Sequence, residues 1–249
     1  MKTIYLNYIQ YGNREIFFKI ERSDRRKTVG IYVSPKAGVV VRSPRSLDAK
    51  RINELIRKRA RWIIAKQEFI NTHSQLGSEK EFVSGESFFY LGRQYRLKVL
   101  KTASKEAEGC KLMSGRFFIG INGDLSSAEI KRAVKKSLIN WYIQRAGEKI
   151  PQRVELYAHQ IGKWPERIEI KDHKSRWGSC SRNGVVRFNW KIIMAPVSIL
   201  DYVIVHELCH LIHQPHSTRF WQKVQAIIPD YARRRKRLKE YSLTLSAFD

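Results

Sequence analysis

The chain has 249 residues, of which 43% are hydrophobic and 29% charged, and its 48 Lys and Arg outnumber its 23 Asp and Glu to give a formal net charge of +25. This composition excludes a disordered chain and suffices for the core of one large or two small domains. Three scattered cysteines exclude a disulfide framework. No apolar run is long enough to cross a membrane, and the N-terminus lacks the hydrophobic segment of a signal peptide. We therefore expect a cytoplasmic protein without a membrane partner.

Residues 1–125 are predicted to form a mostly β module with one long helix. Alternating residues favour strands within 4–20, and the turn sequence at 34–38 lies between the two strands of a predicted hairpin. Apolar residues at helical spacing predict a helix from Ser46 to about Thr72. Strands punctuated by glycine follow at 88–91, 95–100 and 117–121.

Residues 126–249 are predicted to form a second, α+β domain. Ser126 opens a capping signal for a helix that runs to about residue 160. Pro196 stands at the first turn of a strongly apolar helix, where proline is well tolerated. Ser217 is the expected N-cap of a further helix, and a helical tail ends the chain. Two strands are expected at 167–170 and 184–190.

The net charge favours polyanionic partners, above all nucleic acid bound through its phosphates. The alternative is a basic surface with no dedicated partner. The densest basic cluster falls on the predicted C-terminal helix, where it either contacts phosphates or forms a solvated face. The cluster comprises Arg233, Arg234, Arg235, Lys236 and Arg237.

Residues 206–210 read His-Glu-Leu-Cys-His, an H-E-x-x-H motif. His206 and His210 are four residues apart, so on a helix they share one face and can bind one metal ion. Neutral imidazoles suit Zn²⁺, which keeps one position open in a catalytic site. Glu207, beside the first ligand, can take a proton from a water molecule that the metal makes acidic. These are the roles generally assigned to this motif in zinc proteases.

A catalytic zinc site needs a third protein ligand, and two histidines compete for that position. His213 falls on the same helix face, but about 10 Å along the axis from His206 at ~1.5 Å per residue. His216 is the better candidate, because Pro215 ends the helix and lets the chain fold back toward the metal. A distant carboxylate, such as Glu240, is the remaining alternative.

The surroundings of the motif argue against a chance match. The helix around it is strongly apolar and is therefore expected to be buried, and buried His and Glu side chains need partners. A metal ion satisfies all of them. A cluster of structural histidines without a metal is the alternative.

The strand at 184–190 comes shortly before the metal helix. An exposed edge there could pair with an extended peptide and place its carbonyl beside the metal. Arg187, Phe188 and Asn189, together with Trp177 in the preceding polar stretch, are therefore the candidate substrate-binding residues. An ordinary hairpin is the alternative.

Several stretches together resemble the YgjP-like metallopeptidases, a family related to the SprT-like and Wss-type zinc proteases within the zincin fold. They are 25–28, 90–92, 175–180, 195–210 and the His216-Ser217-x-x-Phe220-Trp221 run, and they span most of the chain. The resemblance implies a zinc ion held by His206, His210 and His216, with Glu207 as the catalytic residue. SprT-like relatives act on DNA-bound or DNA-crosslinked proteins, which agrees with the net charge.

We therefore expect an α+β protein with a zincin-like catalytic domain that binds one Zn²⁺ per chain. The expected function is that of a zinc metallopeptidase acting on protein or peptide substrates, with proteins associated with nucleic acid as candidate targets. There are two alternatives: a basic nucleic-acid-binding protein whose metal is structural, and a zinc amidohydrolase with a non-protein substrate.

Overall fold

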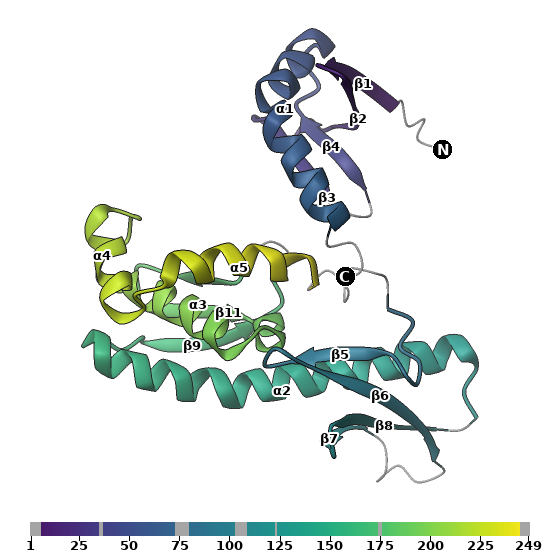
Figure 1. Cartoon of the computed structure of the whole chain (residues 1–249), viewed down its shortest axis with the longest axis vertical. Coiled ribbons are helices and arrows are strands. Elements are labelled where there is room, and N and C mark those ends of the chain that lie inside the picture. The colour runs from purple at the N-terminus through teal and green to yellow at the C-terminus, as the bar shows by residue number, and fades with distance from the viewer. Residues whose placement is uncertain are drawn as a thin grey trace. The chain divides into compact units, whose positions relative to one another are not determined.

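Two compact units make up the chain, Met1–Ser78 and Glu79–Asp249 (Figure 1). The observed division after Ser78 differs from the boundary near residue 125 that the sequence predicted. The reason is packing, because Phe117 of the second sheet and Leu138 of the helix after it belong to one hydrophobic core. The computed structural model describes residues 6–34, 37–72, 80–102, 109–122, 124–173 and 176–244. The predicted turn residues Pro35 and Lys36, and Ser175 of the family-like stretch, lie outside these ranges.

The first unit is a four-stranded sheet with a helix on one face. Its elements are β1 (Leu6–Tyr11), β2 (Arg14–Arg22), β3 (Gly30–Ser34), β4 (Gly38–Ser43) and α1 (Ala49–Thr72). The strand order is β1-β2-β4-β3, with β2 and β4 parallel. Because side chains alternate along a strand, Ile16 and Phe18 both face α1, where they share a core with Ile52 and Ile56. The predicted helix at 46–72 is therefore confirmed, with its apolar face against the sheet.

The second unit begins with a similar sheet and a longer helix. Its elements are β5 (Ser87–Tyr90), β6 (Arg93–Thr102), β7 (Gly109–Met113), β8 (Arg116–Asn122) and α2 (Ser127–Ile161). The strand order is β5-β6-β8-β7, with β6 and β8 parallel. Strand β7 was not predicted, because its residues Gly-Cys-Lys-Leu-Met include none that is β-branched. The helix starts where predicted, and the amide of Ser126 donates to Glu129 Oε2 at 3.0 Å.

The two sheets are built alike. In both, the first, second, fourth and third strands are neighbours in that order, with the same parallel and antiparallel pairings. Their registers correspond as well, since Phe18 pairs with Val39 in the first sheet and Leu97 pairs with Phe117 in the second. One helix follows the fourth strand in each case. The chain therefore uses one ββββα arrangement twice.

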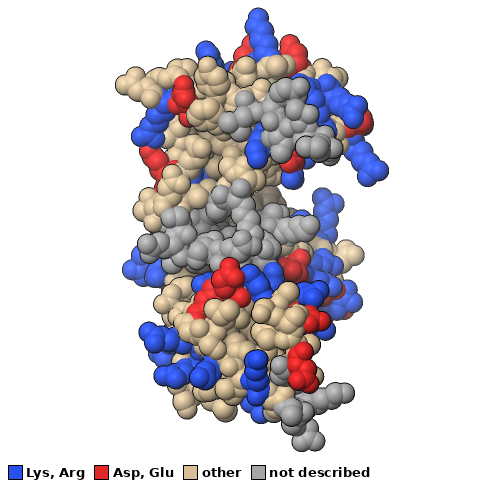
Figure 2. All heavy atoms as spheres, turned by 90° about the vertical axis from the view of Figure 1, so that its right-hand side faces the viewer, with Lys and Arg blue, Asp and Glu red and all other residues tan. Residues whose placement is uncertain are grey.

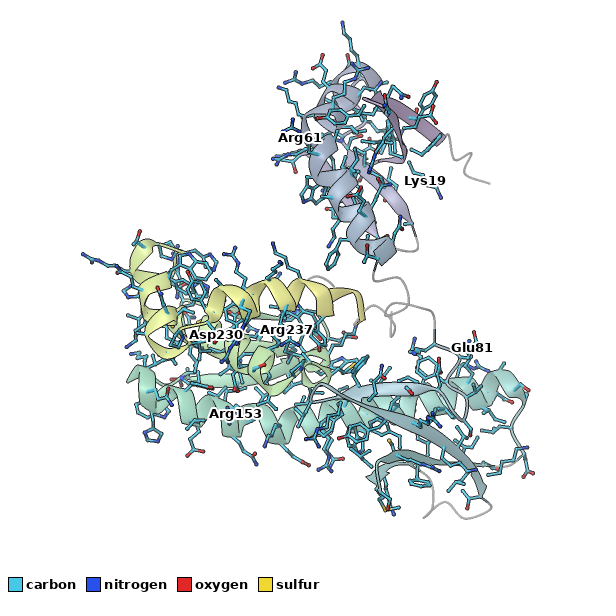
Figure 3. All side chains as sticks on the ribbon, in the orientation of Figure 1. Lys19, Arg61, Glu81, Arg153, Asp230 and Arg237 are labelled. Carbon is cyan, nitrogen blue, oxygen red and sulfur yellow. The ribbon has the colours of Figure 1, made fainter. Side chains whose placement is uncertain are left out.

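The remaining elements pack onto α2 and carry the motif. They are β9 (Arg167–Lys171), β10 (Gly178–Cys180), β11 (Val185–Asn189), the 3₁₀ helix Trp190–Met194, α3 (Val197–Cys209), α4 (Thr218–Ile227) and α5 (Tyr231–Thr244). The strand order is β10-β11-β9. Arg153 of α2 binds Asp201 of α3 through two hydrogen bonds of 2.7 Å, Nε to Oδ1 and Nη2 to Oδ2. Figure 3 shows Arg153 on α2 below the motif helix.

The described ranges contain five α-helices and three small sheets, which confirms the predicted α+β class. No helix within these ranges has an apolar stretch of bilayer-spanning length.

Candidate metal centre and active site

Helix α3 fixes the positions of His206 and Glu207. Almost all of its residues are buried, as the apolar sequence predicted. The helix ends at Cys209, earlier than Pro215, and the chain continues through tight turns. The side-chain amide of Gln214 donates to the carbonyl of His210 at 2.8 Å, which satisfies a carbonyl group at the helix end. The chain then reverses direction before His216.

Three imidazoles meet where the chain reverses. Ring nitrogens of His206, His210 and His216 all lie within 4.8 Å of one another. The Nε2 atoms of His206 and His216 are 3.0 Å apart. The Nδ1 atom of His210 lies 3.1 Å from the carbonyl oxygen of His213, which leaves Nε2 of His210 free to face the other two rings.

The geometry favours His216 over His213 as the third candidate ligand. It is the backbone carbonyl of His213 that contacts the group, in the supporting position in which a ligating histidine commonly finds a carbonyl partner. The ring that joins His206 and His210 is that of His216. The side chain of Glu240 lies outside those that the structure describes.

Phe220 holds all three imidazoles in place. It is fully buried, and its ring centroid lies 5.0, 4.5 and 4.9 Å from those of His206, His210 and His216. Its amide donates to Ser217 Oγ at 3.3 Å, so the predicted N-cap of α4 is confirmed and also positions this ring. The sequence signal for it was the aromatic pair one turn after a capping serine.

Burial favours the neutral form of two of the histidines, His206 and His216. Desolvation, followed by the neighbouring His210, His216 and Arg235, lowers the pKa of His206 to about 3. Desolvation also lowers the pKa of His216, with smaller contributions from His210 and Arg235. Neutral imidazoles offer the lone pairs that a metal ion requires.

Glu207 is buried beside the histidines, with 7% of its surface exposed. Desolvation raises the pKa of its carboxyl group to about 8, partly offset by the positive charge of Arg176. The backbone of Gly178 in β10 lies directly against it, because a Cβ atom there would come 2.7 Å from Glu207 Oε1. Sequence reasoning placed Gly178 in a small polar stretch and missed both the strand and this contact.

The predicted substrate-binding residues do not form an exposed edge. Strand β11 is the central strand, and the edge strand next to α3 is β10. Phe188 is fully buried, and Arg187 Nε donates to Glu169 Oε2 at 2.9 Å. Asn189 donates to the carbonyls of His173 and Arg176 at 2.8 and 3.1 Å. These contacts correct the expectation that 184–190 is the edge, because β10 covers that side of β11.

Trp177 immediately precedes the edge strand. It is half-buried and packs against the core of the second unit, and its carbonyl accepts the amide of Asn189 at 2.8 Å. Among the four predicted substrate residues, Trp177 is the one that directly precedes β10 in the sequence.

The basic cluster of α5 is partly engaged in contacts within the second unit. Arg233 and Arg234 bind Asp230 at 2.6 and 2.8 Å, and Arg234 also donates to the carbonyl of Ser198 at 3.1 Å. The guanidinium of Arg235 lies 4.8 Å from the ring centroid of Trp221. Lys236 and Arg237 are exposed. Figure 2 shows Lys and Arg spread over the visible face with acidic residues among them, without one continuous basic patch.

The three histidines fit a divalent metal ion. Zinc–nitrogen distances of about 2.0–2.1 Å in a tetrahedral site place the ligand nitrogens roughly 3.3 Å from one another, close to the 3.0 Å between His206 and His216 Nε2. The three rings also contact one aromatic side chain, Phe220. If all three bind, a tetrahedral ion would have one further position for water, as in catalytic sites.

A group of three imidazoles beside a buried carboxyl group is typical of the site of a metal-dependent hydrolase. The chain belongs to the YgjP-like family, because the model of the YgjP-like metallopeptidase domain matches residues 27–241. No curated protein matches the chain. Among solved structures, the metallopeptidase zymogen of Pyrococcus abyssi abylysin is similar over 36% of this chain and 90% of that chain, with 20% identity and a TM-score of 0.34.

Proposed function

We propose that the protein is a zinc-dependent endopeptidase in which Glu207 is the general base. The observation that carries this proposal is the convergence of His206, His210 and His216 next to the buried Glu207. Zinc is favoured over harder cations because all three donors are imidazoles. A divalent ion in such a site acts as a Lewis acid that polarises a carbonyl group and makes water acidic at neutral pH.

Glu207 supplies the proton transfer. Its carboxylate accepts the proton of the attacking water and then delivers it to the amine that leaves, which balances the reaction without a further group. Burial and the close contact with Gly178 restrict the movement of the carboxyl group. The positive charge of Arg176 partly offsets the effect of burial, and the charge of a bound divalent ion would further favour the ionised form that accepts the proton.

Strand β10 is the surface on which we place the peptide. Its one strand partner in the described ranges is β11, so its other edge can pair with an extended substrate. Because Gly178 is in close contact with Glu207, a peptide paired with β10 would lie beside the proposed base. This arrangement supports a peptide substrate over the small molecule of an amidohydrolase, since a free strand edge suits an extended backbone.

Proteins associated with nucleic acid are the targets that we propose. The support is the net charge of +25, which attracts polyanions and the proteins bound to them. Digests of a DNA-binding protein and of a protein that does not bind DNA, each in the presence and absence of DNA, test this target class. Cleavage that does not depend on nucleic acid would contradict it while leaving the peptidase proposal intact.

The central test compares the wild-type protein with Glu207→Gln. Fragments of a mixed protein substrate are identified by mass spectrometry, and zinc per chain is measured by elemental analysis. We expect about one zinc in both proteins and a loss of turnover of at least about 10²-fold in the variant. Glu155→Gln, an exposed carboxyl on α2, is the matched control and should cleave normally. Equal turnover of Glu207→Gln and wild type would remove Glu207 from the mechanism.

A further inference from the structure

The outer face of the first sheet carries exposed aromatic rings. Tyr8 is 58% exposed, Phe17 46% and Tyr32 44%. Alternation along β2 places Phe17 and Lys19 on the side opposite to α1. We call Tyr8, Phe17, Lys19, Tyr32 and Arg42 the aromatic sheet face. Several large exposed rings on one face are typical of an interaction surface.

The rings of this face are held in defined positions. Tyr8 is directly opposite Phe17 in the β1–β2 register, and their ring centroids are 5.8 Å apart. The guanidinium of Arg42 lies 4.9 Å from the centroid of Tyr32. Gly30 leaves room for that ring, since a Cβ atom there would come 2.8 Å from Tyr32 Cε2. Aromatic groups are thus presented to solvent on a rigid sheet.

The second ββββα arrangement shows that the fold itself does not require these rings. Its positions equivalent by register to the three aromatic residues bear no aromatic side chain. They are Ser87, Arg96 and Lys111. The second sheet therefore has no ring at these three positions, and its own rings on that face, Phe89 and Phe118, lie at other positions of the register. The three exposed rings of the first sheet are thus not required by the shared fold.

The charge of the first unit indicates the kind of partner. Residues 1–78 include 17 Lys and Arg and six Asp and Glu. Several of the acidic side chains are already paired within the unit, including Glu21 with Arg42 at 2.7 Å and Glu68 with Arg14. Exposed aromatic rings in a positive field fit a partner that has both flat apolar groups and negative charge.

We propose that the aromatic sheet face binds single-stranded nucleic acid. Unpaired bases stack on Phe17 and Tyr8, and Lys19 contacts the phosphates between them, because every base has a π-face and stacking tolerates any sequence. A duplex cannot use these rings, since its bases are already stacked inside the helix. The inference rests on the proposed association with nucleic acid and does not depend on the peptidase chemistry.

Fluorescence anisotropy of the full-length protein with a labelled oligothymidylate tests the proposal, using an oligomer of about 20 nucleotides to exceed the usual site size. A duplex of the same length is measured at the same salt concentration. We expect the single strand to bind more tightly. Phe17→Leu, which keeps an apolar side chain, should raise the single-strand Kd about tenfold, with the thermal midpoint measured alongside to show that the variant is folded.

Charge controls separate this face from the rest of the unit. Lys19→Ala should reduce the slope of log Kd against log salt concentration by about 1, the value expected for the loss of one phosphate contact. Arg61→Ala removes an equally charged side chain from the exposed face of α1, on the other side of the unit, and should not change the preference for single strands (Figure 3).

Three outcomes would overturn the proposal. Equal or tighter binding of the duplex would place recognition on phosphates alone, and an unchanged Kd in folded Phe17→Leu would exclude the aromatic sheet face. No binding of either oligomer would remove both this inference and the proposed target class. In each case the Glu207→Gln comparison would still report on hydrolysis separately.

Discussion

A Cβ atom on Gly178 would lie 2.6 Å from Cγ of Glu207, so the backbone of β10 and the side chain of the proposed base are in direct contact. No side chain larger than hydrogen fits between them without displacing one or the other. A shift of the edge strand would therefore displace the carboxyl group, and the reverse. This contact is the link between where a peptide would lie and where its bond would be attacked.

Gly178→Ala is accordingly expected to reduce turnover strongly while leaving the metal in place. The new methyl group must push the Glu207 carboxyl away from its position, and displacements of about 1 Å at such sites lower rates by roughly 10²-fold. Peptide cleavage and zinc content are measured together. Ser179→Ala is the control, because the next side chain along a strand points to the opposite face. Normal turnover in Gly178→Ala would show that the contact is not needed.

Two histidine variants distinguish ligand from support. His216→Ala should lose zinc on dialysis against a chelator, because its ring is one of the three that converge. His213→Ala should keep zinc, since only the backbone carbonyl of His213 contacts His210 and the substitution retains that carbonyl. Elemental analysis after dialysis gives the answer. Retention of zinc in His216→Ala together with loss in His213→Ala would reverse the assignment.

The Arg153–Asp201 pair is expected to stabilise the second unit. Asp201 is almost fully buried and Arg153 is 25% exposed, so Asp201→Ala leaves a partly buried guanidinium without its partner and should lower the free energy of unfolding by about 2 kcal/mol. Glu148→Ala removes the exposed pair with Arg145 on the same helix and should change it by less than about 0.5 kcal/mol. Urea unfolding monitored by tryptophan fluorescence compares them. Equal effects would contradict the role of burial.

Asp230 should make the anchoring of α5 dependent on pH. Its hydrogen bond with Arg233, followed by the charges of Arg234 and Arg233, lowers the pKa of its carboxyl group. A lowered folded-state pKa contributes stability that is present above the ordinary value of about 3.9 and is lost as pH falls through the folded value. The difference in unfolding free energy between wild type and Asp230→Asn should therefore be constant near neutral pH and shrink below about pH 4. A difference that grows on acidification would have the wrong sign.

Local sequence signals were enough for most elements. The spacing of Ile52 and Ile56 predicted α1, and Ser217 predicted the start of α4, because helical periodicity and N-caps act over a few residues. The H-E-x-x-H motif likewise placed His206 and His210 on one helix face. These features depend on neighbours in the chain, and so they can be read from it.

Features that depend on distant partners could not be read. The division of the chain was placed near residue 125 because strands precede that point and helices follow it, yet packing of Phe117 on Trp141, with ring centroids 5.0 Å apart, joins the two sides. Strand β10 has only three residues, too few for an alternation pattern, so β11 was taken for the edge. The role of Gly178 depends on its contact with Glu207, which lies 29 residues later in the chain and so gives no local signal.

The α2 helix contacts two parts of the second unit. Its first half packs against the β5–β8 sheet, and its second half packs against the motif helix, to which Arg153 is hydrogen-bonded. Hydrogen exchange along α2 would therefore report on both at once. Loosening of that sheet is therefore expected to reduce the protection of the part of α2 that packs against the motif helix.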